Sequence, residues 1–538
     1  MTSKVEARIP AGMRDILPPD MIKRDYVLGV VRQVFEKYGY EPMQTSALEL
    51  TETMAGKYGE DAERLIYKAW YGDSPAGEFS LRYDLSVPLC RLIAMNANDL
   101  TRPFKRYQIA PVYRADRPQK GRYREFYQCD IDVVGSESML ADAEIIAVIY
   151  EVLNTLGFTA FTISINNRKI LDGIGQYVGV PDNLRPGLYR SIDKLDKIGL
   201  EGVRRELLMV GVPTEFMQAI QKVARLGIQG KVELDAMRRA LVDEGVPTDL
   251  ALGLESALHE TVEDAIARAV PSNELQAETR AIAQGLAPEL REFYNEQADQ
   301  FIPMDVVDKL LDLLQISGPV GQVLDDLEMR LKDSAVGMEG LSEMRDLFYY
   351  TAAFGVPEDA CALNFAMVRG LEYYTGPILE TTVSEPKAMP SICGGGRYDG
   401  LIGRFGDVDI PATGGSLGIE RIIDVMDELD MFPDDIKLTT SDVLVTVFDA
   451  STAAASLDVV TSLRQAGINS MIYFEPGDRL GDQLGYASSK GIPFVVIIGP
   501  DELATGKATI RKLGKTKKDS EQREVDLASV AAEIASWT

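Results

Sequence analysis

A long helical stretch between two β-rich segments is the feature that most limits how this chain can fold. Residues from about 170 to 355 are acidic and helical by period, and they are broken by three Gly-Val-Pro turns, at 211–213, 245–247 and 355–357. Before this stretch, from about 80 to 165, short β-rich runs such as Tyr107–Tyr113 and Tyr127–Val134 alternate with basic, glycine-containing loops. Strand-like, glycine-rich sequence returns at 363–421. The pattern predicts a β-rich domain interrupted by a helical insertion.

The two ends of the chain have their own patterns. Residues 20–38 show the apolar period of an amphipathic helix, which Gly39 should end. After Asp434, apolar runs alternate with helical stretches; the runs are Val443–Phe448, Ser470–Phe474 and Phe494–Ile498, and the helical stretches are 453–466 and 480–490. Strands that alternate with helices indicate a parallel α/β sheet. We therefore expect a separate C-terminal domain.

Composition excludes several classes of function. The chain of 538 residues carries a net charge of −27, so an RNA partner must dock on local basic patches. The only histidine, His259, lies in a helical stretch, where a surface or packing role is the favoured interpretation. A single histidine excludes zinc hydrolases with histidine ligands and argues against a Ser-His-Asp triad. Any chemistry must therefore rest on arginine, carboxylates, tyrosine and a metal ion.

The predicted location is cytoplasmic. The N-terminal residues show no secretory signal, and the longest apolar run, Phe494–Ile498, is far too short to cross a bilayer. The four cysteines are scattered without the spacing of a zinc site or a disulfide framework: Cys90, Cys129, Cys361 and Cys393. A reducing compartment and no membrane partner are the expectations.

Two basic segments stand out in this acidic chain. Segment 101–124 has one acid, Asp116, against eight basic residues: Arg102, Lys105, Arg106, Arg114, Arg117, Lys120, Arg122 and Arg124. Arginine matches phosphate oxygens bidentately, so a nucleotide phosphate or an RNA backbone suits this segment; a solvated basic face is the alternative. Segment 505–518 has six basic residues and no acid. It is interpreted either as an RNA contact or as a solvated hairpin tip.

Clustered glycines mark a second candidate site. Arg369–Gly376 is followed closely by Gly394–Asp399, which begins with three glycines. Glycine lets a backbone approach a ligand closely, although hairpin turns would also explain the clusters. The chain lacks the phosphate-binding loop with Gly-Lys-Ser/Thr and lacks a Gly-x-Gly-x-x-Gly that opens a βαβ unit. The residues alone thus indicate a multidomain protein that handles anions with arginine.

Together these segments resemble the class II histidyl-tRNA synthetases, in order and across nearly the whole chain. Leu81–Pro88 resembles the family's first substrate loop. Tyr113–Arg117 through Arg124–Phe126 resembles class motif 2, and Gly414–Arg421 resembles motif 3. The two histidine-specific signatures correspond to Arg369–Gly376 and Gly395–Asp399, and the sequence after about 440 is similar to the family's anticodon-binding domain.

The resemblance implies an α+β class II catalytic core, which is an antiparallel sheet with flanking helices, together with a helical insertion and a C-terminal α/β anticodon-binding domain. The implied division is 1–170 for the first part of the catalytic domain with motifs 1 and 2, 171–355 for the insertion and the return to the core, 356–434 for the second catalytic part, and 435–538 for the anticodon-binding domain. Motif 1, placed around residues 40–80, implies a homodimer.

The implied activity is ligation of histidine to tRNA(His) with ATP and Mg²⁺, whose protein ligands the sequence does not assign. The catalytic residues implied are Arg114, on the α-phosphate and the substrate carboxylate, and Arg369, a second guanidinium at the reacting phosphate. Phe126 and Arg421 are implied on opposite faces of adenine, with Arg114 as the third ATP-binding residue. Fixed positive charge of this kind accelerates phosphoryl-type transfer without a side-chain base.

Histidine recognition follows from the chemistry of imidazole, which offers one N–H donor and one acceptor nitrogen when neutral. The family's equivalents that meet these two groups are Asp132 and Tyr374, while Asp84, Ser86 and Gln128 match positions that hold the α-amino group. The full implied set of histidine-binding residues is Asp84, Leu85, Ser86, Arg114, Gln128, Asp132, Arg369, Tyr373 and Tyr374. Such a polar pocket rejects apolar rivals by leaving its own groups unpaired, so no editing domain is expected.

Two residues depart from the family pattern, and two alternative functions stay open. Glu372 stands where the family usually has Asp, and we expect activity to be retained. Asp482 stands in the C-terminal domain where a basic residue is expected. A histidyl-synthetase-like regulatory subunit of ATP phosphoribosyltransferase is one alternative, and a catalytically inactive tRNA-sensing paralogue is another. The C-terminal domain and the intact Arg-Gly-Leu-x-Tyr-Tyr signature that begins at Arg369 argue against the regulatory subunit. Intact Arg114, Arg369 and Arg421 argue against the inactive paralogue.

Overall fold

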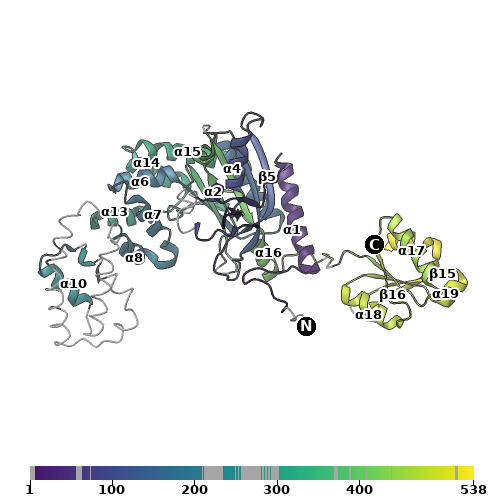
Figure 1. Cartoon of the computed structure of the whole chain (residues 1–538). Helices are drawn as coiled ribbons and strands as arrows, with labels where there is room; N and C mark the ends of the chain where they lie inside the picture. The colour runs from purple at the N-terminus through teal and green to yellow at the C-terminus, as the bar shows by residue number, and fades with distance from the viewer. Residues whose placement is uncertain are drawn as a thin grey trace. The chain divides into compact units, whose positions relative to one another are not determined.

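The structure is a computed structural model of the chain (Figure 1). It describes residues 6–55, 63–72, 74–208, 210, 234–248, 250–252, 254–255, 280, 284, 288, 291, 302–368, 373–386, 389–406, 409–434, 436–437, 439–514 and 519–537. The chain divides into two compact units. The larger comprises Val31–Val425, and the smaller unites Met1–Val30 with Met426–Thr538.

An eight-stranded sheet forms the centre of the larger unit. Its strands, in spatial order, are β1 (Glu41–Pro42), β5 (Phe104–Tyr113), β6 (Glu125–Val134), β11 (Ala412–Gly418), β10 (Cys393–Arg397), β9 (Pro377–Val383), β7 (Phe161–Asn167) and β8 (Cys361–Leu363). The five inner pairings are antiparallel, whereas β1 pairs with β5, and β8 with β7, in parallel. The predicted antiparallel core is therefore confirmed, with a parallel strand at each edge.

One face of this sheet is apolar and is covered by a helix. The helix α5 (Met139–Thr155) packs against β6, β10 and β11, and it begins where Ser138 accepts a hydrogen bond from the Leu140 backbone N–H. On β6 the side chains of Ile131 and Val133 are buried beside it. Because successive side chains of a strand point to opposite faces, the residues between them belong to the other face.

The described residues between 168 and 353 are mostly helical, as the sequence predicts. The described helices are α6 (Arg168–Val178), α7 (Arg185–Ile192), α8 (Leu195–Leu208), α10 (Leu234–Asp243), α13 (Met304–Leu314), α14 (Val320–Leu331) and α15 (Ala335–Ala353). Of these, α6, α14 and α15 contact one another, and α15 also contacts α5 of the core (Figure 1). His259 lies outside the described residues, so its predicted role stays a prediction.

A small three-stranded sheet lies earlier in the chain. Its strands are β2 (Leu48–Leu50), β4 (Phe79–Leu81) and β3 (Lys68–Ala69), in the order β2-β4-β3. Two helices accompany it, the short α2 (Thr51–Met54) and α4 (Ser86–Met95), and a 3₁₀ helix, η3 (Asp399–Phe405), contacts α4. The N-terminal helix α1 (Pro18–Lys37) matches the predicted helix at 20–38 within two residues at each end. The helix α16 (Ile419–Glu428) follows β11 directly.

The C-terminal domain has its own five-stranded sheet, in the order β13 (Ser470–Ile472), β12 (Val443–Val445), β14 (Phe494–Ile497), β15 (Lys507–Lys512) and β16 (Glu521–Asp526). Its helices are α17 (Ala453–Gln465), α18 (Leu480–Lys490), α19 (Pro500–Thr505) and α20 (Val530–Trp537), with a 3₁₀ turn, η5 (Leu527–Ser529), before the last of these. Strands β13, β12 and β14 are parallel, as predicted, but β15 and β16 form an antiparallel hairpin. The hairpin explains the difference, because its strands follow one another without a crossover helix.

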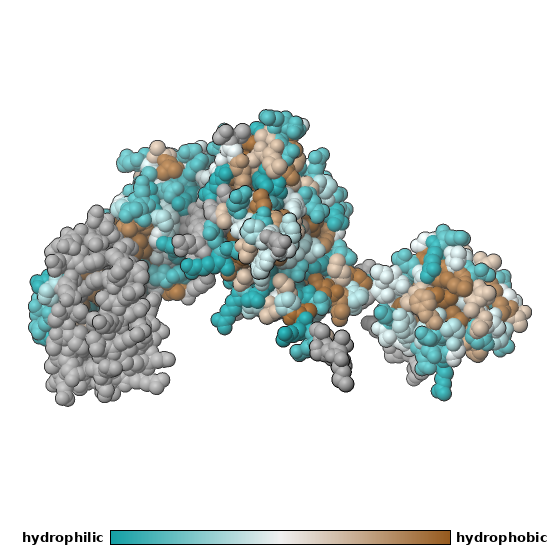
Figure 2. All heavy atoms as spheres, in the orientation of Figure 1, coloured by the Kyte–Doolittle hydropathy of each residue, from teal (hydrophilic) through white to brown (hydrophobic). Residues whose placement is uncertain are grey.

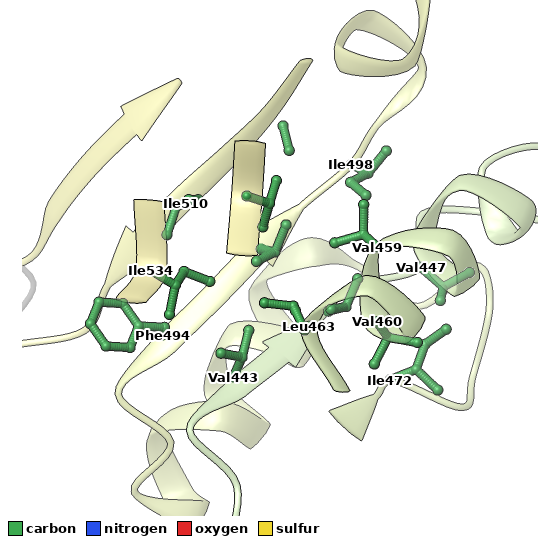
Figure 3. Close-up of a cluster of buried hydrophobic side chains, with 14 residues drawn as sticks. Val443, Val447, Val459, Val460, Leu463, Ile472, Phe494, Ile498, Ile510 and Ile534 are labelled. Carbon is green, nitrogen blue, oxygen red and sulfur yellow. The ribbon is translucent and has the colours of Figure 1, made fainter. Parts of the chain in front are cut away.

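Side chains from α17, α20 and the sheet close the core of this domain (Figure 3). Val443, Phe494 and Ile510 of the sheet pack with Leu463 of α17 and Ile534 of α20. The cluster of 14 buried side chains gives the domain a hydrophobic core of its own, as the sequence predicts.

On the visible face of the molecule, hydrophilic and hydrophobic side chains are interspersed (Figure 2). Among the described helices, none combines the length and the apolar character that crossing a bilayer requires.

Candidate active site

The second face of the central sheet carries polar side chains near its middle. The register aligns Arg106 of β5 with Asp132 of β6, and Gln108 with Asp130. On the other side of β6, Ser416 of β11 is the partner of Asp130. Residues directly opposite one another in antiparallel strands share a face, so these side chains form one continuous polar surface.

A buried ion pair anchors this surface. Arg106 Nη2 lies 2.6 Å from Asp132 Oδ2, and the two side chains are 0% and 3% exposed. The Tyr398 hydroxyl donates a hydrogen bond to Asp132 Oδ1. Burial raises the pKa of Asp132 above its ordinary value, while Arg106 and Tyr398 oppose that rise by stabilising the charged form. Asp132, predicted to meet the imidazole ring, thus already has two protein partners.

Two glycines bring Tyr374 and Asp132 to neighbouring positions on the sheet. A Cβ atom on Gly396 would lie 2.9 Å from Tyr374 Cδ1, and one on Gly414 would lie 2.2 Å from Asp132 Oδ1. Gly396 and Gly414 are register partners on β10 and β11. Any larger residue at either position would displace a side chain of the predicted histidine pocket. The Tyr373 ring lies next to that of Tyr374, with centroids 4.3 Å apart.

The predicted first substrate loop forms the start of α4. Asp84 Oδ1 accepts a hydrogen bond from the Val87 backbone N–H, at 3.1 Å, and so satisfies one of the free donors at the helix N-terminus. Leu85 is fully buried, and its carbonyl oxygen accepts a hydrogen bond from Arg106. Ser86 is the first residue of the helix. Of Asp84, Leu85 and Ser86, it is therefore Leu85 whose side chain packs in the hydrophobic core.

Gln128 is held by β11. Its Nε2 donates to Ser416 Oγ at 2.8 Å, and the residue is 9% exposed. Asp130 lies between Gln128 and Asp132 on the same face of β6 and is 3% exposed. Burial raises the pKa of Asp130 to about 7; Arg106 and a hydrogen bond from Ser416 lower it, while Asp132 and Asp84 raise it further. Because Asp84 and Asp132 both affect the pKa of Asp130, the three carboxyl groups lie around one site.

Arg114 lies between two aromatic rings. Its guanidinium carbon is 4.3 Å from the ring centroid of Tyr83 and 5.1 Å from that of Phe126, and its Nε donates to the Tyr83 carbonyl oxygen at 3.0 Å. Cation–π contacts of this kind hold a guanidinium in one orientation. The structure therefore brings together Arg114 and Phe126, two of the three residues predicted to bind ATP.

Arg421, the third predicted ATP-binding residue, spans the motif 2 loop and a segment before β10. Its Nε donates to the Gly121 carbonyl oxygen at 2.8 Å, and its Nη1 donates to the Ser391 carbonyl oxygen. The Cβ position of Gly121 is 3.7 Å from the Arg421 side chain. Arg421 thus contacts the motif 2 loop at Gly121, within the basic segment 101–124 that is predicted to suit a phosphate.

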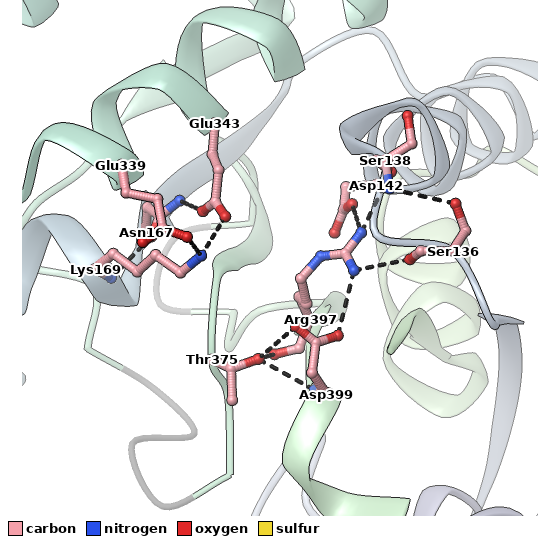
Figure 4. Close-up of polar contacts among 10 residues, drawn as sticks. All are labelled: Ser136, Ser138, Asp142, Asn167, Lys169, Glu339, Glu343, Thr375, Arg397 and Asp399. Carbon is pink, nitrogen blue, oxygen red and sulfur yellow. Dashed lines mark hydrogen bonds and ion pairs between the residues drawn. The ribbon is translucent and has the colours of Figure 1, made fainter. Parts of the chain in front are cut away.

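The second histidine-specific signature contains residues that hold the framework together (Figure 4). Arg397 is 2% exposed and forms ion pairs with Asp142 of α5 and with Asp399. Its Nη1 also donates to the Ser136 carbonyl oxygen at 2.9 Å. The arginine therefore ties β10 to the start of α5, away from the polar surface of the sheet.

The basic segment 101–124 does not act as one surface. Arg106 is buried against Asp132, and Lys105 forms an ion pair with Glu144 at 2.5 Å. Arg122 pairs with Asp116 at 2.8 Å. The alternative of a solvated basic face is therefore wrong for Arg106, which strand alternation turns inward, whereas the Arg122 side chain is 47% exposed.

Several predicted residues cannot be placed. Arg369 and Glu372 of the first histidine-specific signature lie outside the described residues, as do Lys515, Lys517 and Lys518 of the C-terminal basic segment. Within the described part of that segment, Lys507 pairs with Glu524 at 2.5 Å across the β15–β16 hairpin. Half of the six basic residues of this segment therefore lie in strand β15, namely Lys507, Arg511 and Lys512.

Sequence reasoning missed four residues of the polar surface: Arg106 as an internal counter-charge, Asp130, Ser416 and Tyr398. A signal for Asp130 was present, because Gln128, Asp130 and Asp132 recur with the period of two that places side chains on one face of a strand. Tyr398 lies within the predicted signature Gly395–Asp399, but its contact with Asp132 depends on the fold.

A mostly antiparallel sheet with arginine and carboxylate side chains on one face, flanking helices and a separate α/β domain together define a class II aminoacyl-tRNA synthetase architecture. The sequence model of the histidyl-tRNA synthetase family matches residues 12–257 and 250–422, and that of the anticodon binding domain matches residues 442–537. The chain belongs to the histidyl-tRNA synthetase family.

Individual relatives agree with this assignment. The chain is 35% identical over 524 residues to the histidine–tRNA ligase of Cytophaga hutchinsonii, covering 94% of this chain and 95% of that protein. It is 36% identical over 515 residues to the histidine–tRNA ligase of Aeropyrum pernix, covering 95% and 94%. The crystal structure of histidyl-tRNA synthetase from Nostoc is similar with a TM-score of 0.70 and 29% identity, covering 99% of this chain and 100% of that one.

Proposed function

We propose that this chain is a histidine–tRNA ligase, which activates histidine with ATP to histidyl-adenylate and pyrophosphate and then transfers histidine to the 3′ end of tRNA(His). Membership of the family and relatives of that activity along nearly the whole chain support the ligase reaction. The single observation that carries the proposal in the structure is the pairing of Asp132 and Tyr374 over neighbouring glycines on the polar face of the sheet.

In the proposed complex, Arg114 contacts the ATP α-phosphate and the histidine carboxylate, and Arg369 is the second guanidinium at the reacting phosphate. The contacts of Arg114 with Tyr83 and Phe126 support this role, since they fix its orientation before substrate arrives. Negative charge builds on the phosphorus centre as the carboxylate attacks. Preorganised positive charge stabilises that state without any side-chain base.

Adenine is proposed to stack on Phe126, with Arg421 on its other face. The hydrogen bonds of Arg421 to the Gly121 and Ser391 carbonyl oxygens support a guanidinium held beside the motif 2 loop. Mg²⁺ is proposed to enter with ATP. Because the ion keeps several waters and binds phosphates readily, it needs few protein ligands, and the described residues contain no group of three or more His, Cys, Asp or Glu side chains arranged for a metal.

Histidine is proposed to lie along β6. Its imidazole meets Asp132 and Tyr374, with Tyr373 beside them, and its α-ammonium meets Asp84, Gln128 and the start of α4 at Leu85 and Ser86. The ion pair of Asp132 with Arg106 supports an ionised Asp132, which can accept from an imidazole N–H. A substrate without these polar groups would leave buried donors and acceptors unpaired, which makes the pocket selective.

The partners proposed beyond ATP and histidine are tRNA(His) and a second copy of the chain. The C-terminal domain is proposed to bind the anticodon, and the predicted boundaries at 170, 355 and 434 belong to the same proposal. For the homodimer, strand β2 offers support: Leu48 and Leu50 are 42% and 44% exposed, while the charged Glu49 between them is buried against Arg91. An apolar strand face turned outward suits a self-complementary contact.

A cytoplasmic location is also proposed. All four cysteines are buried free thiols, which suits a reducing compartment.

The testing experiment is histidine-dependent exchange of pyrophosphate into ATP, followed by charging of tRNA(His). A ligase performs both reactions. A regulatory subunit or an inactive tRNA sensor would bind histidine or tRNA without exchange, and that result would exclude the proposed activity.

A further inference from the structure

Asp130 is a buried carboxylate at the centre of the polar surface, and the proposed reaction has so far given it no role. It lies between Gln128 and Asp132 on one face of β6, with Gln108 of β5 and Ser416 of β11 as its register partners. Every second residue of a strand advances by about 6.6–6.8 Å. Asp130 therefore lies beneath the middle of a ligand that reaches from Gln128 to Asp132.

The hydroxyl of Ser416 connects Asp130 to Gln128. A hydrogen bond from Ser416 lowers the pKa of Asp130, which means that it stabilises the ionised carboxylate. An ionised carboxylate only accepts hydrogen bonds, so Ser416 must be the donor. With its single proton used in this way, the Ser416 oxygen can only accept, and it accepts from Gln128 Nε2 at 2.8 Å.

This order of donors decides which way the Gln128 amide points. Its Nε2 must face Ser416, so its Oε1 faces away from that hydroxyl. Within the part of the chain that the structure describes, Gln128 Oε1 is buried and has no hydrogen-bond partner, and neither has Asp130 Oδ1. A buried acceptor without a partner is costly unless a ligand supplies the donor. An ammonium group supplies up to three donors.

We propose that Asp130 is a positioning residue: through Ser416 it fixes the Gln128 amide so that Oε1 is presented to the α-ammonium group of histidine. The proposal rests on the proposed function, which assigns Gln128 to that ammonium group. It differs from a packing role because the effect is confined to one group of the substrate.

Charge around Asp130 makes the arrangement depend on pH. The charged groups that face it are Arg106 from β5, Arg82 from the segment after β4, Asp132 from β6 and Asp84 from the segment before α4; Ser416 and Gln108 are uncharged. A protonated Asp130 can itself donate to Ser416, which frees the serine proton for Gln128 Oε1 and lets the amide reverse. The ammonium of bound histidine favours the ionised form, so the contribution of Asp130 to binding grows as pH rises through 7.

The test compares two ligands on the full-length protein by calorimetry. Histidine has the α-ammonium, whereas imidazole-4-propionate keeps the ring and the carboxylate but lacks it. Ser416→Ala should raise the Kd for histidine about tenfold, the scale of one hydrogen bond to a charged group, and change the Kd for imidazole-4-propionate less than twofold. Equal weakening of both ligands, or no weakening of histidine, overturns the proposal.

Thr413→Val is the matched control. Thr413 lies on the same strand as Ser416; it is buried, whereas Ser416 is partly buried, and the Thr413 hydroxyl bonds to a different buried carboxyl, that of Asp142. Its neighbour in register is Val133, on the opposite face of the sheet. The control variant should keep wild-type affinity for histidine; if it loses as much as Ser416→Ala, the effect is general packing.

Asp130→Asn gives a second measurement that does not depend on the folding of Ser416→Ala. The ratio of its histidine Kd to that of the wild type should rise at least fivefold from pH 6 to pH 8, and titration of histidine itself cancels in this ratio. A ratio independent of pH contradicts the proposal. Pyrophosphate exchange by the wild type is read separately: its absence would refute the ligase activity, whereas the ligand comparison would still decide the role of Asp130.

Discussion

Arg106 and Asp132 form an ion pair inside the catalytic sheet, with Arg106 Nη2 2.6 Å from Asp132 Oδ2 and both side chains excluded from solvent. Arg106 belongs to the basic segment 101–124, whereas Asp132 is the residue predicted to recognise the imidazole ring. A buried charge without its partner is strongly destabilising, so each member constrains the other. The carboxylate that is proposed to select histidine is therefore held in one position by the framework.

Asp132→Asn should weaken histidine binding and leave ATP binding nearly unchanged, because the amide keeps the shape but loses the charge that faces the imidazole. It should also lower the free energy of unfolding by about 3–5 kcal/mol, since Arg106 loses its counter-charge. Exchange kinetics and urea denaturation measure the two effects. Asp142→Asn is the control: it breaks the buried pair with Arg397 and should cost stability without a selective effect on histidine. Equal losses for both substrates in Asp132→Asn would mean that Asp132 is structural and that the pocket lies elsewhere.

Arg369→Ala should lower the adenylation rate by at least about 10²-fold, the scale for the loss of one preorganised donor. Histidine binding should suffer less, because the proposed contact forms mainly as charge develops on the phosphate. Single-turnover pyrophosphate exchange gives the rate. Arg330→Ala, which removes an exposed arginine paired with Asp326 on α14, should be neutral. A rate for Arg369→Ala within a few-fold of the wild type would remove Arg369 from the catalytic set.

Asp130 should make stability depend on pH. Burial raises its pKa to about 7 in the folded protein, against an ordinary value of 3.8. Its contribution is therefore fully present below pH 4 and is lost as pH rises through 7, because the unfolded chain releases the proton first. Relative to Asp130→Asn, the free energy of unfolding of the wild type should fall by about 2–3 kcal/mol between pH 5 and pH 7, since each pKa unit corresponds to about 1.4 kcal/mol. Urea denaturation of both proteins checks this, and parallel pH profiles would argue against a proton on Asp130.

Leu48→Glu with Leu50→Glu should convert the proposed homodimer to monomers, because charges would be buried at a contact between two copies of β2. Light scattering should then report 59.2 kDa instead of twice that mass. Leu457→Glu, at a 51% exposed leucine of the C-terminal domain, is the matched control and should leave the mass unchanged. A wild type that is monomeric and fully active contradicts the prediction directly.

Reversal of Lys515, Lys517 and Lys518 to glutamate should weaken tRNA binding and flatten its dependence on salt, because fewer phosphate counterions are released on binding. Exchange of pyrophosphate should stay intact, since it needs only the catalytic site. Filter binding at several salt concentrations provides the slope. Lys490→Glu, at the end of α18, tests whether any lysine of the domain has the same effect. Unchanged affinity and slope in the triple variant would leave the basic segment as a solubilising hairpin tip.

The periodic elements of this protein were determined by sequence alone. The alternation of apolar and polar residues predicted strands at Tyr107–Tyr113 and Tyr127–Val134, which the structure extends to β5 and β6. The spacing of apolar residues placed the helices at 453–466 and 480–490 within one residue of α17 and α18. These features are local, because burial of one face of a strand or helix fixes the period of its own sequence.

The direction and partners of each strand were decided by the tertiary structure. The three apolar runs after Asp434 form parallel strands, as predicted, but the antiparallel pairing of β15 with β14 and β16 was not predicted, because β15 and β16 lack an apolar run. In the same way, no property of the segment 101–124 marked Arg106 as buried or Arg114 as held between two rings. Those roles depend on which residues lie opposite on β6 and in the segment before α4.

The polar surface shows the same division. The period of two in β6 is enough to place Gln128, Asp130 and Asp132 on one face of the strand, although Asp130 itself was not predicted as a site residue. Only the fold brought Ser416, Tyr398 and Arg106 against them, from positions up to 288 residues away in the case of Ser416 and Gln128. Whether a carboxylate binds a substrate, a counter-charge or a neighbouring hydroxyl depends on those distant partners, and a one-dimensional pattern carries no information about them.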